Sequence, residues 1–326
     1  MDNVYVGVAE LKRLHVAAVA LHLTSAILGL LIAKSGDPAV PVSATLVRFE
    51  KGSLLVPDPK LIFSTKALLP SIVVEFITAF FHVVYFFALT RPTVDALVRR
   101  IADTPSANPL RWVEYAITAT LMSAFGNTAV GISDFYYFLK TVFTGVCLQA
   151  VGYVIELLDV ASPRDGRLFN IMWWVLGFGL NLPSIGILLY QIFASRTGSS
   201  QRLFIENCVP FAVWYNTFGL VAMYAYKKEG KFRDRFYAER WYTVLSLSTK
   251  LAVFWLGFGT FKKISEDNHV SGRSGVDWDA VRYSAMSLPA AVVLAYIWYD
   301  WRTGGRSRRL ATRSYISYTL WTPVNL

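Results

Sequence analysis

The sequence is poor in charged residues, and the charges that it has lie mostly between long apolar runs. Asp, Glu, Lys and Arg make up 17% of the 326 residues, whereas hydrophobic residues make up 54%. Apolar runs of about 20 residues span a bilayer as helices, so this composition indicates a membrane protein. The net charge of +10 would suit nucleic acid, but the basic residues cluster in alternate connecting segments, as membrane topology requires. We therefore expect the lipid bilayer as a partner and no nucleic acid.

Cysteine and histidine are also scarce, with two and four copies. Cys147 and Cys208 both fall in apolar segments, where packing is a more ordinary role than a disulfide or a metal site. The sequence has no His-Glu-x-x-His pattern, and Gly131-Ile-Ser-Asp-Phe135 does not match the nucleophile elbow of hydrolases. These absences predict a protein that is not an enzyme, with no metal and no catalytic residues.

Seven apolar segments are long enough to span the bilayer, and a weaker eighth segment is interrupted by Pro289. The basic connecting segments place the N-terminus in the cytoplasm and the end of the seventh segment outside. The eighth segment is either a further span or a helix lying on the membrane surface. The segments are near 14–33, 67–89, 111–131, 135–158, 169–193, 204–226, 241–261 and 282–300.

These segments predict an all-α membrane protein of the cell membrane, a seven-transmembrane helix bundle over residues 1–263. Residues 264–326 form a C-terminal extension that contains the eighth hydrophobic segment. The first connecting loop, residues 34–66, has a pattern of its own: within 42–56, Val47 and Phe49 alternate with charged residues before Lys51-Gly52. That pattern predicts a β-hairpin on the outer face. Because an exposed hairpin edge can pair with a second copy, we expect a homodimer contact there.

Lys250 stands alone in the apolar segment 241–261, about 15 Å from either end at helical rise. Placing an ammonium group at that depth in the membrane costs at least about 2.5–3.5 kcal/mol, so the group needs a partner or a function. A buried lysine in the seventh of seven helices is typical of a covalent retinal site, because a desolvated amine attacks aldehydes. The charge of a protonated imine needs a carboxylate, and Glu114 in Arg111-Trp-Val-Glu-Tyr-Ala is the candidate counterion. Ser246 lies one turn before Lys250 on the same face; a Lys250–Glu114 ion pair that only holds helices together is the structural alternative.

Over about residues 5–263 the chain resembles the heliorhodopsins. The resemblance rests on the cytoplasmic N-terminus, on Trp-Val-Glu114-Tyr115-Ala, on Ser246-Leu-Ser-Thr-Lys250 and on the intramembrane histidines His22 and His82. It implies all-trans retinal bound to Lys250 as a protonated Schiff base, with Glu114 as counterion and Ser246 as its neighbour. It also implies a cytoplasmic-side cavity near His22 and His82 that takes up a proton, and a homodimer formed through the first loop.

Further residues are candidates for the retinal pocket and for a proton path. Glu75 and Glu206 fall in the outer halves of their segments, and Glu75 shares a face with His82, about 10 Å away along a helix. We expect them to carry light-driven protons, the alternative being that both carboxylates sit in water at the outer rim. Glu156 lies within a turn of an inner end, where we expect a solvated carboxylate. The pocket candidates on neighbouring segments are Tyr115, Gln149, Trp173, Trp174, Trp214 and Tyr215.

Three other interpretations remain open. The protein would be a non-transporting photosensory receptor if light only changes its cytoplasmic face, with a signalling partner that the sequence does not identify. It would be a membrane electron carrier if His22 and His82, with His15, ligate haem, although this leaves Lys250 without a role. A lipid-facing scaffold without a cofactor is the third interpretation.

Overall fold

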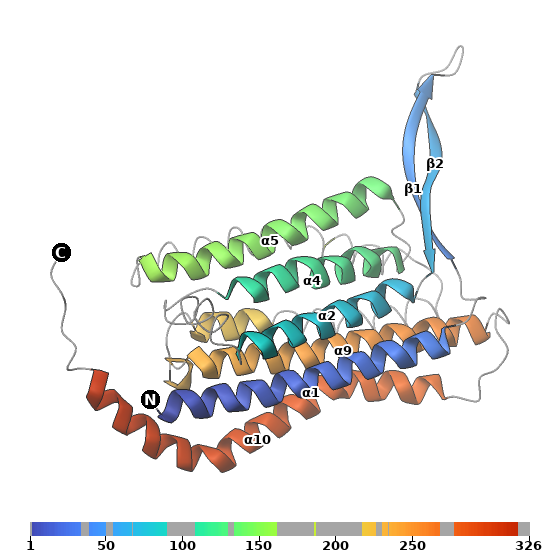
Figure 1. Cartoon of the computed structure of the whole chain (residues 1–326). Coiled ribbons are helices and arrows are strands. Elements are labelled where there is room, and N and C mark those ends of the chain that lie inside the picture. The colour runs from blue at the N-terminus through green and yellow to red at the C-terminus, as the bar shows by residue number, and fades with distance from the viewer. Residues whose placement is uncertain are drawn as a thin grey trace.

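The structure is a computed structural model, and it describes residues 2–33, 39–49, 55–66, 68–89, 108–129, 134–161, 186, 217–225, 230–233, 235–267 and 277–318. Within these ranges the protein is a bundle of long helices from which one two-stranded hairpin projects (Figure 1). The labelled elements are α1 (Asp2–Ile32), β1 (Ala39–Phe49), β2 (Leu55–Lys66), α2 (Leu69–Ala88), α4 (Pro109–Ala129), α5 (Phe135–Ala161), η2 (Gly230–Arg233), α9 (Arg235–Asp267) and α10 (Trp278–Tyr318).

Five of the described helices contain a stretch long and apolar enough to cross a membrane. A spanning helix satisfies its own backbone hydrogen bonds, which is why such stretches fold as single long helices in lipid. The helix α4 is less apolar because it carries Arg111 and Glu114, yet it coincides closely with the expected segment 111–131. The five stretches are Ala9–Ile32, Leu69–Ala88, Phe135–Glu156, Tyr237–Lys263 and Trp278–Tyr299.

The expected segments therefore correspond to described helices wherever the chain is described. The expected segment 169–193 lies outside the described residues except for residue 186. Of the segment 204–226, only residues 217–225 are described, and they are helical. The protein is mostly helical, as the sequence predicts.

The hairpin expected in the first loop is confirmed and is longer than the alternation alone suggested. β1 and β2 pair antiparallel from Ala39↔Lys66 to Phe49↔Leu55, with a register shift between Val42 and Ser43. Residues 50–54, which contain the expected turn, lie outside the described residues. The hairpin rises from the end of the bundle opposite the start of α1 (Figure 1), and Ser43 of β1 forms an isolated bridge with Asp134, the residue before α5.

The helix α9 lies at the centre of the described bundle, packed against α1, α2 and α10. Every residue from 242 to 250 on this helix is buried. Close approach to α1 depends on Gly29, where a Cβ atom would lie 2.7 Å from Cζ of Phe254. A core cluster continues from there, formed by Ala26, Leu68, Ile72, Phe254, Phe258 and Trp278.

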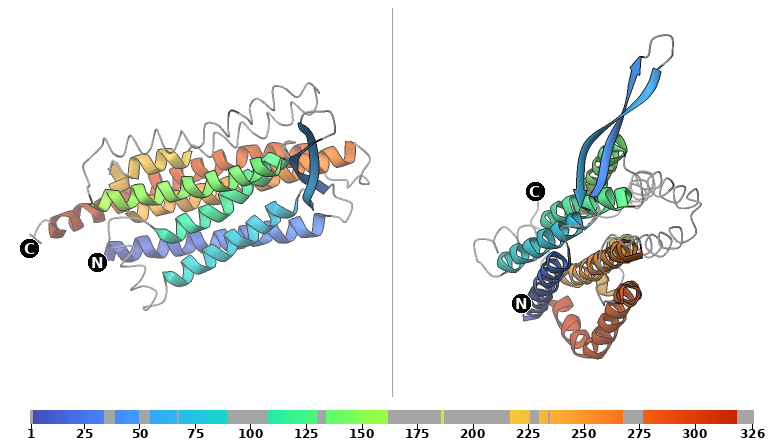
Figure 2. Two further views of the ribbon diagram at one scale, coloured as in Figure 1. Left: turned by 90° about the horizontal axis from the view of Figure 1, so that it is seen from above. Right: turned by 90° about the vertical axis from the view of Figure 1, so that its right-hand side faces the viewer.

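The helix α10 contains the eighth hydrophobic segment and runs antiparallel to α9. Near its start, Cγ of Arg282 would lie 2.8 Å from a Cβ atom on Gly259. Further along, the ring of Tyr296 meets that of Trp241 edge-on at 4.9 Å. The part of α10 up to residue 299 thus lies along the bundle, beside α9 and α1 (Figure 2).

Candidate functional site

The amine of Lys250 points into the bundle and meets a carboxylate. Its Nζ atom donates to Oε1 of Glu114 at 2.5 Å and to Oγ1 of Thr78 at 3.2 Å. Lys250 is 5% exposed and Glu114 is 2% exposed. Removing either charge alone would leave the other buried without compensation, which costs about 3–5 kcal/mol. The expected pairing of Lys250 with Glu114, made from positions 136 residues apart, is present in the structure.

Two further predicted residues surround this ion pair. Nζ of Lys250 lies 5.4 Å from the centroid of the Tyr115 ring, within the range of a cation–π interaction. Ser246 is 2% exposed, one turn before Lys250 on α9, and its hydroxyl has no hydrogen-bond partner in the described part of the chain. Tyr115 follows Glu114 on α4, so one helix supplies both the carboxylate and the ring.

A second group of buried polar residues lies between α1 and α2. Nδ1 of His22 lies 2.5 Å from Oε2 of Glu75, and both residues are at most 1% exposed. Nδ1 of His15 lies 2.9 Å from Nδ1 of His82. The rings of His22 and His82 stack with centroids 5.6 Å apart, and the ring of His15 stacks on Tyr85 at 4.9 Å. We call these five residues the histidine ladder.

The histidine ladder passes directly beside Lys250. On α2 the buried residues Glu75, Thr78, His82 and Tyr85 follow one another at intervals of three and four, so they share one face of the helix. Thr78 contacts Lys250 from that face. The ladder and the Lys250–Glu114 pair therefore form one buried polar region.

The burial of Glu75 corrects one expectation. The interpretation that Glu75 sits in water at the outer rim is wrong, because this carboxylate is 1% exposed and bonded to His22. A carboxylate one and a half turns from a helix end is normally within reach of water. Here α1 covers it, and His22 supplies the partner that makes burial tolerable.

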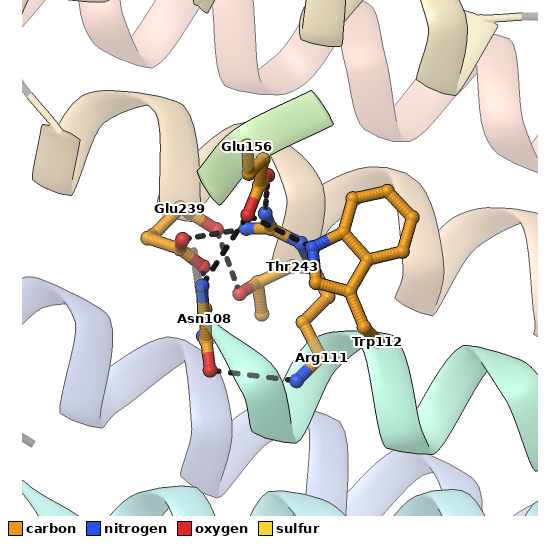
Figure 3. A network of polar contacts seen from close by, with 6 residues as sticks. All are labelled: Asn108, Arg111, Trp112, Glu156, Glu239 and Thr243. Carbon is orange, nitrogen blue, oxygen red and sulfur yellow. Dashed lines mark hydrogen bonds and ion pairs between the residues drawn. The ribbon is translucent and has the colours of Figure 1, made fainter. Parts of the chain in front are cut away.

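A third polar cluster, which sequence reasoning missed, joins α4, α5 and α9 (Figure 3). Arg111 binds Glu239 through Nη1 at 2.5 Å and binds Glu156 through Nη2. Its guanidinium carbon lies 3.9 Å from the centroid of the Tyr242 ring. Trp112 donates from Nε1 to Oε2 of Glu156 at 2.8 Å. The guanidinium fork thus holds two carboxylates from two other helices.

Local sequence explains how α4 presents this cluster. Asn108 and Pro109 are the cap and first residue of α4, a pairing that suits a helix start. The amide of Arg111 donates to Oδ1 of Asn108 at 3.4 Å, and Nδ2 of Asn108 donates to Oε2 of Glu239 at 3.2 Å. The expectation that Glu156 is a solvated carboxylate is wrong in part: its side chain is 23% exposed but is bound by Arg111 and Trp112. The only signal in the sequence was that residues of opposite charge lie near helix ends. Their spacing along the sequence does not reveal that they meet in the fold.

The remaining predicted residues are less informative. Gln149 is 7% exposed on α5, and no hydrogen bond or ring contact joins it to Lys250 in the described part of the chain. Cys147 is a half-buried free cysteine on α5. The other candidates lie outside the described residues: Trp173, Trp174, Trp214, Tyr215, Glu206 and Cys208.

The residues present fit a retinal group attached at Lys250. The amine is buried, a carboxylate lies 2.5 Å from it, and a hydroxyl and an aromatic ring complete its surroundings. This set provides both an attachment point and a charge partner for a protonated imine. For haem the fit is poorer, because the rings of His22 and His82 stack face to face with centroids 5.6 Å apart, whereas two imidazoles that share one iron point their Nε2 atoms at it from opposite sides.

Comparison with known proteins yields one family. The model of the family described as Heliorhodopsin matches residues 11–261, from within α1 to near the end of α9. The match contains both members of the Lys250–Glu114 pair and the whole histidine ladder, and it ends before α10. No curated protein matches the chain.

Proposed function

Since the chain belongs to the heliorhodopsin family, we propose that Lys250 binds all-trans retinal covalently and that Glu114 is the counterion. Members of this family are retinal-binding, light-sensing membrane proteins with seven transmembrane helices, and the family is not one of classical enzymes. The observation that supports the assignment of residues is the buried contact of 2.5 Å between Nζ of Lys250 and Oε1 of Glu114.

Retinal, when bound as a protonated Schiff base, supplies visible absorption and an isomerisation that moves the charge at Nζ relative to its surroundings. Glu114 holds the compensating negative charge on α4. Thr78 accepts a hydrogen bond from Nζ at 3.2 Å, and the centroid of the Tyr115 ring lies 5.4 Å from Nζ. These fixed partners stabilise a positive charge at Nζ in its resting position. They no longer stabilise that charge once it has moved away from them.

We propose light-dependent proton transport as the output. The histidine ladder supports it, because buried carboxylate and imidazole groups in series beside a displaced charge form a proton path in membrane proteins. His22 and His82 would take up the Schiff-base proton, and Glu75 with Glu206 would form the outer part of the path. The alternative output is a photosensory receptor that signals through its cytoplasmic face. Voltage-clamp recording under illumination separates the two: a photocurrent lost in Glu206→Gln supports transport, and no current at any voltage supports the receptor.

The orientation and assembly that we propose follow the charge pattern. The N-terminus is cytoplasmic, the β1–β2 hairpin is extracellular and pairs with a second copy, and α10 is an eighth span. An eighth span returns Arg302 and the basic residues after it to the cytoplasm, in line with the positive-inside rule. The position of the end of α10 supports this, since it lies at the same end of the bundle as the start of α1 (Figure 1).

The first experiment is visible absorption of the protein expressed with all-trans retinal. We expect a broad visible band in the wild type and none in Lys250→Ala. A narrow Soret band in both proteins would favour haem, and no band in either would refute retinal binding. Lys140→Ala is the matched control, because Lys140 is an exposed lysine on α5, and this variant should keep the band.

A further inference from the structure

The hydrogen bond of His82 is made with His15 and not with His22. Nδ1 of His82 lies 2.9 Å from Nδ1 of His15, whereas its contact with His22 is ring stacking at a centroid distance of 5.6 Å. His22 in turn is bonded to Glu75. The two histidines that the family pattern pairs therefore belong to two separate hydrogen-bonded units in this chain.

The geometry limits what each unit can hold. A bond between two Nδ1 atoms needs one ring to donate and the other to accept, so the two rings cannot both be fully protonated. The His15–His82 unit thus shares one proton between two imidazoles that are 4% and 2% exposed. In the other unit, one proton lies between Nδ1 of His22 and the Glu75 carboxylate. Nε2 of His82 has no protein partner in the described part of the chain, so it can accept a proton in the tautomer in which Nδ1 of His82 donates to His15.

We propose that His15 is the residue that receives the proton from His82, and that this pair carries it toward the end of the bundle where α1 begins. The step balances as follows. A proton binds Nε2 of His82, the proton on Nδ1 of His82 passes to Nδ1 of His15, and Nε2 of His15 releases its own proton. One proton enters and one leaves, and both rings are neutral afterwards with their tautomers exchanged. This proposal rests on the proton transport proposed above and assigns its inner half.

The surroundings of His15 support a route beyond it. His15 stacks on Tyr85 with nearly parallel rings, 8° apart. Five residues nearer the start of α1, about 7.5 Å along the helix, the side chain of Glu10 is bound to Arg240 and is 24% exposed. A proton that leaves His15 in that direction therefore approaches a partly exposed carboxylate.

Light-driven proton release tests the role of His15 in retinal-loaded vesicles with a pH dye on the N-terminal side. His15→Gln should keep the visible band and slow proton appearance roughly a hundredfold, the loss typical of removing an acid–base group. Ser25→Ala is the matched control: it removes a buried hydroxyl of α1 that accepts from Trp255, and it should leave the rate unchanged. A wild-type rate in His15→Gln, with a slowed His22→Gln, would overturn the proposal.

A second measurement does not depend on retinal. In the protein without retinal, histidine-labelled ¹⁵N NMR can detect coupling across the Nδ1–Nδ1 hydrogen bond, and only four histidines contribute signals. We expect one coupled pair that disappears in His15→Gln and in His82→Gln and persists in His22→Gln. A pair that persists in His15→Gln and disappears in His22→Gln would refute the assignment. If retinal binding itself fails, this result still decides whether His15 and His82 share a proton.

Discussion

Replacing Arg111 with methionine removes the cation that binds the carboxylates of both Glu156 and Glu239. Methionine keeps most of the apolar stem and lacks the charge and the five donors of the guanidinium. The variant therefore tests whether this cluster, which joins α4, α5 and α9, stabilises the bundle.

The magnitude follows from burial and geometry. Breaking a buried ion pair by removing one partner costs about 3–5 kcal/mol, because the other charge stays buried without compensation. The side chains of Glu156 and Glu239 are 23% and 16% exposed, so water compensates part of that cost. The lost contact with the Tyr242 ring, 3.9 Å away, adds up to about 2 kcal/mol. We expect the free energy of unfolding of Arg111→Met to fall by about 3 kcal/mol.

The assay is denaturant unfolding in mixed micelles, done on the protein without retinal so that ligand binding does not contribute. Arg111→Lys keeps the charge but not the fork and should lie between the wild type and Arg111→Met. Arg13→Met, at an exposed position of α1, should change stability by less than about 0.5 kcal/mol. A loss in Arg111→Met no larger than that of Arg13→Met would refute the reasoning.

Three further predictions concern the site and the packing. Glu114→Gln removes the negative charge 2.5 Å from Nζ of Lys250, so the pigment at neutral pH should move from a visible to a near-ultraviolet band; an unshifted spectrum would show that another group is the counterion. Gly29→Val places a Cβ atom only 2.7 Å from Cζ of Phe254 and should lower the free energy of unfolding by about 1–3 kcal/mol in the same assay; an unchanged value would mean that α1 and α9 separate freely. In sealed cells, tags at the N-terminus and at the C-terminus should both be protected from an external protease. Digestion of the C-terminal tag alone would show that α10 is not an eighth span.

Much of the candidate site was predictable because buried charges in apolar helices are rare and expensive. Lys250 stood out for that reason, and Glu114 was the natural partner because a cation at that depth requires a carboxylate. The contact with Thr78 and the bond between His15 and His82 were not predictable. They depend on which faces of α1, α2 and α9 meet, and helix rotation is set by packing across the bundle and not by the composition of each helix.

The sequence by itself determined that the chain is a membrane bundle, where most of its helices lie, that the loop 34–66 contains a β-hairpin and that Lys250 needs a partner. Each of these depends on local pattern: run length, alternation and isolated charge. Only the tertiary structure decided that Glu75 is buried against His22, that Arg111 holds two carboxylates and that α10 lies along α9. Those contacts join residues 45 to 128 positions apart in the first two cases, and such separations along the chain are closed only when helices pack and exclude water between them.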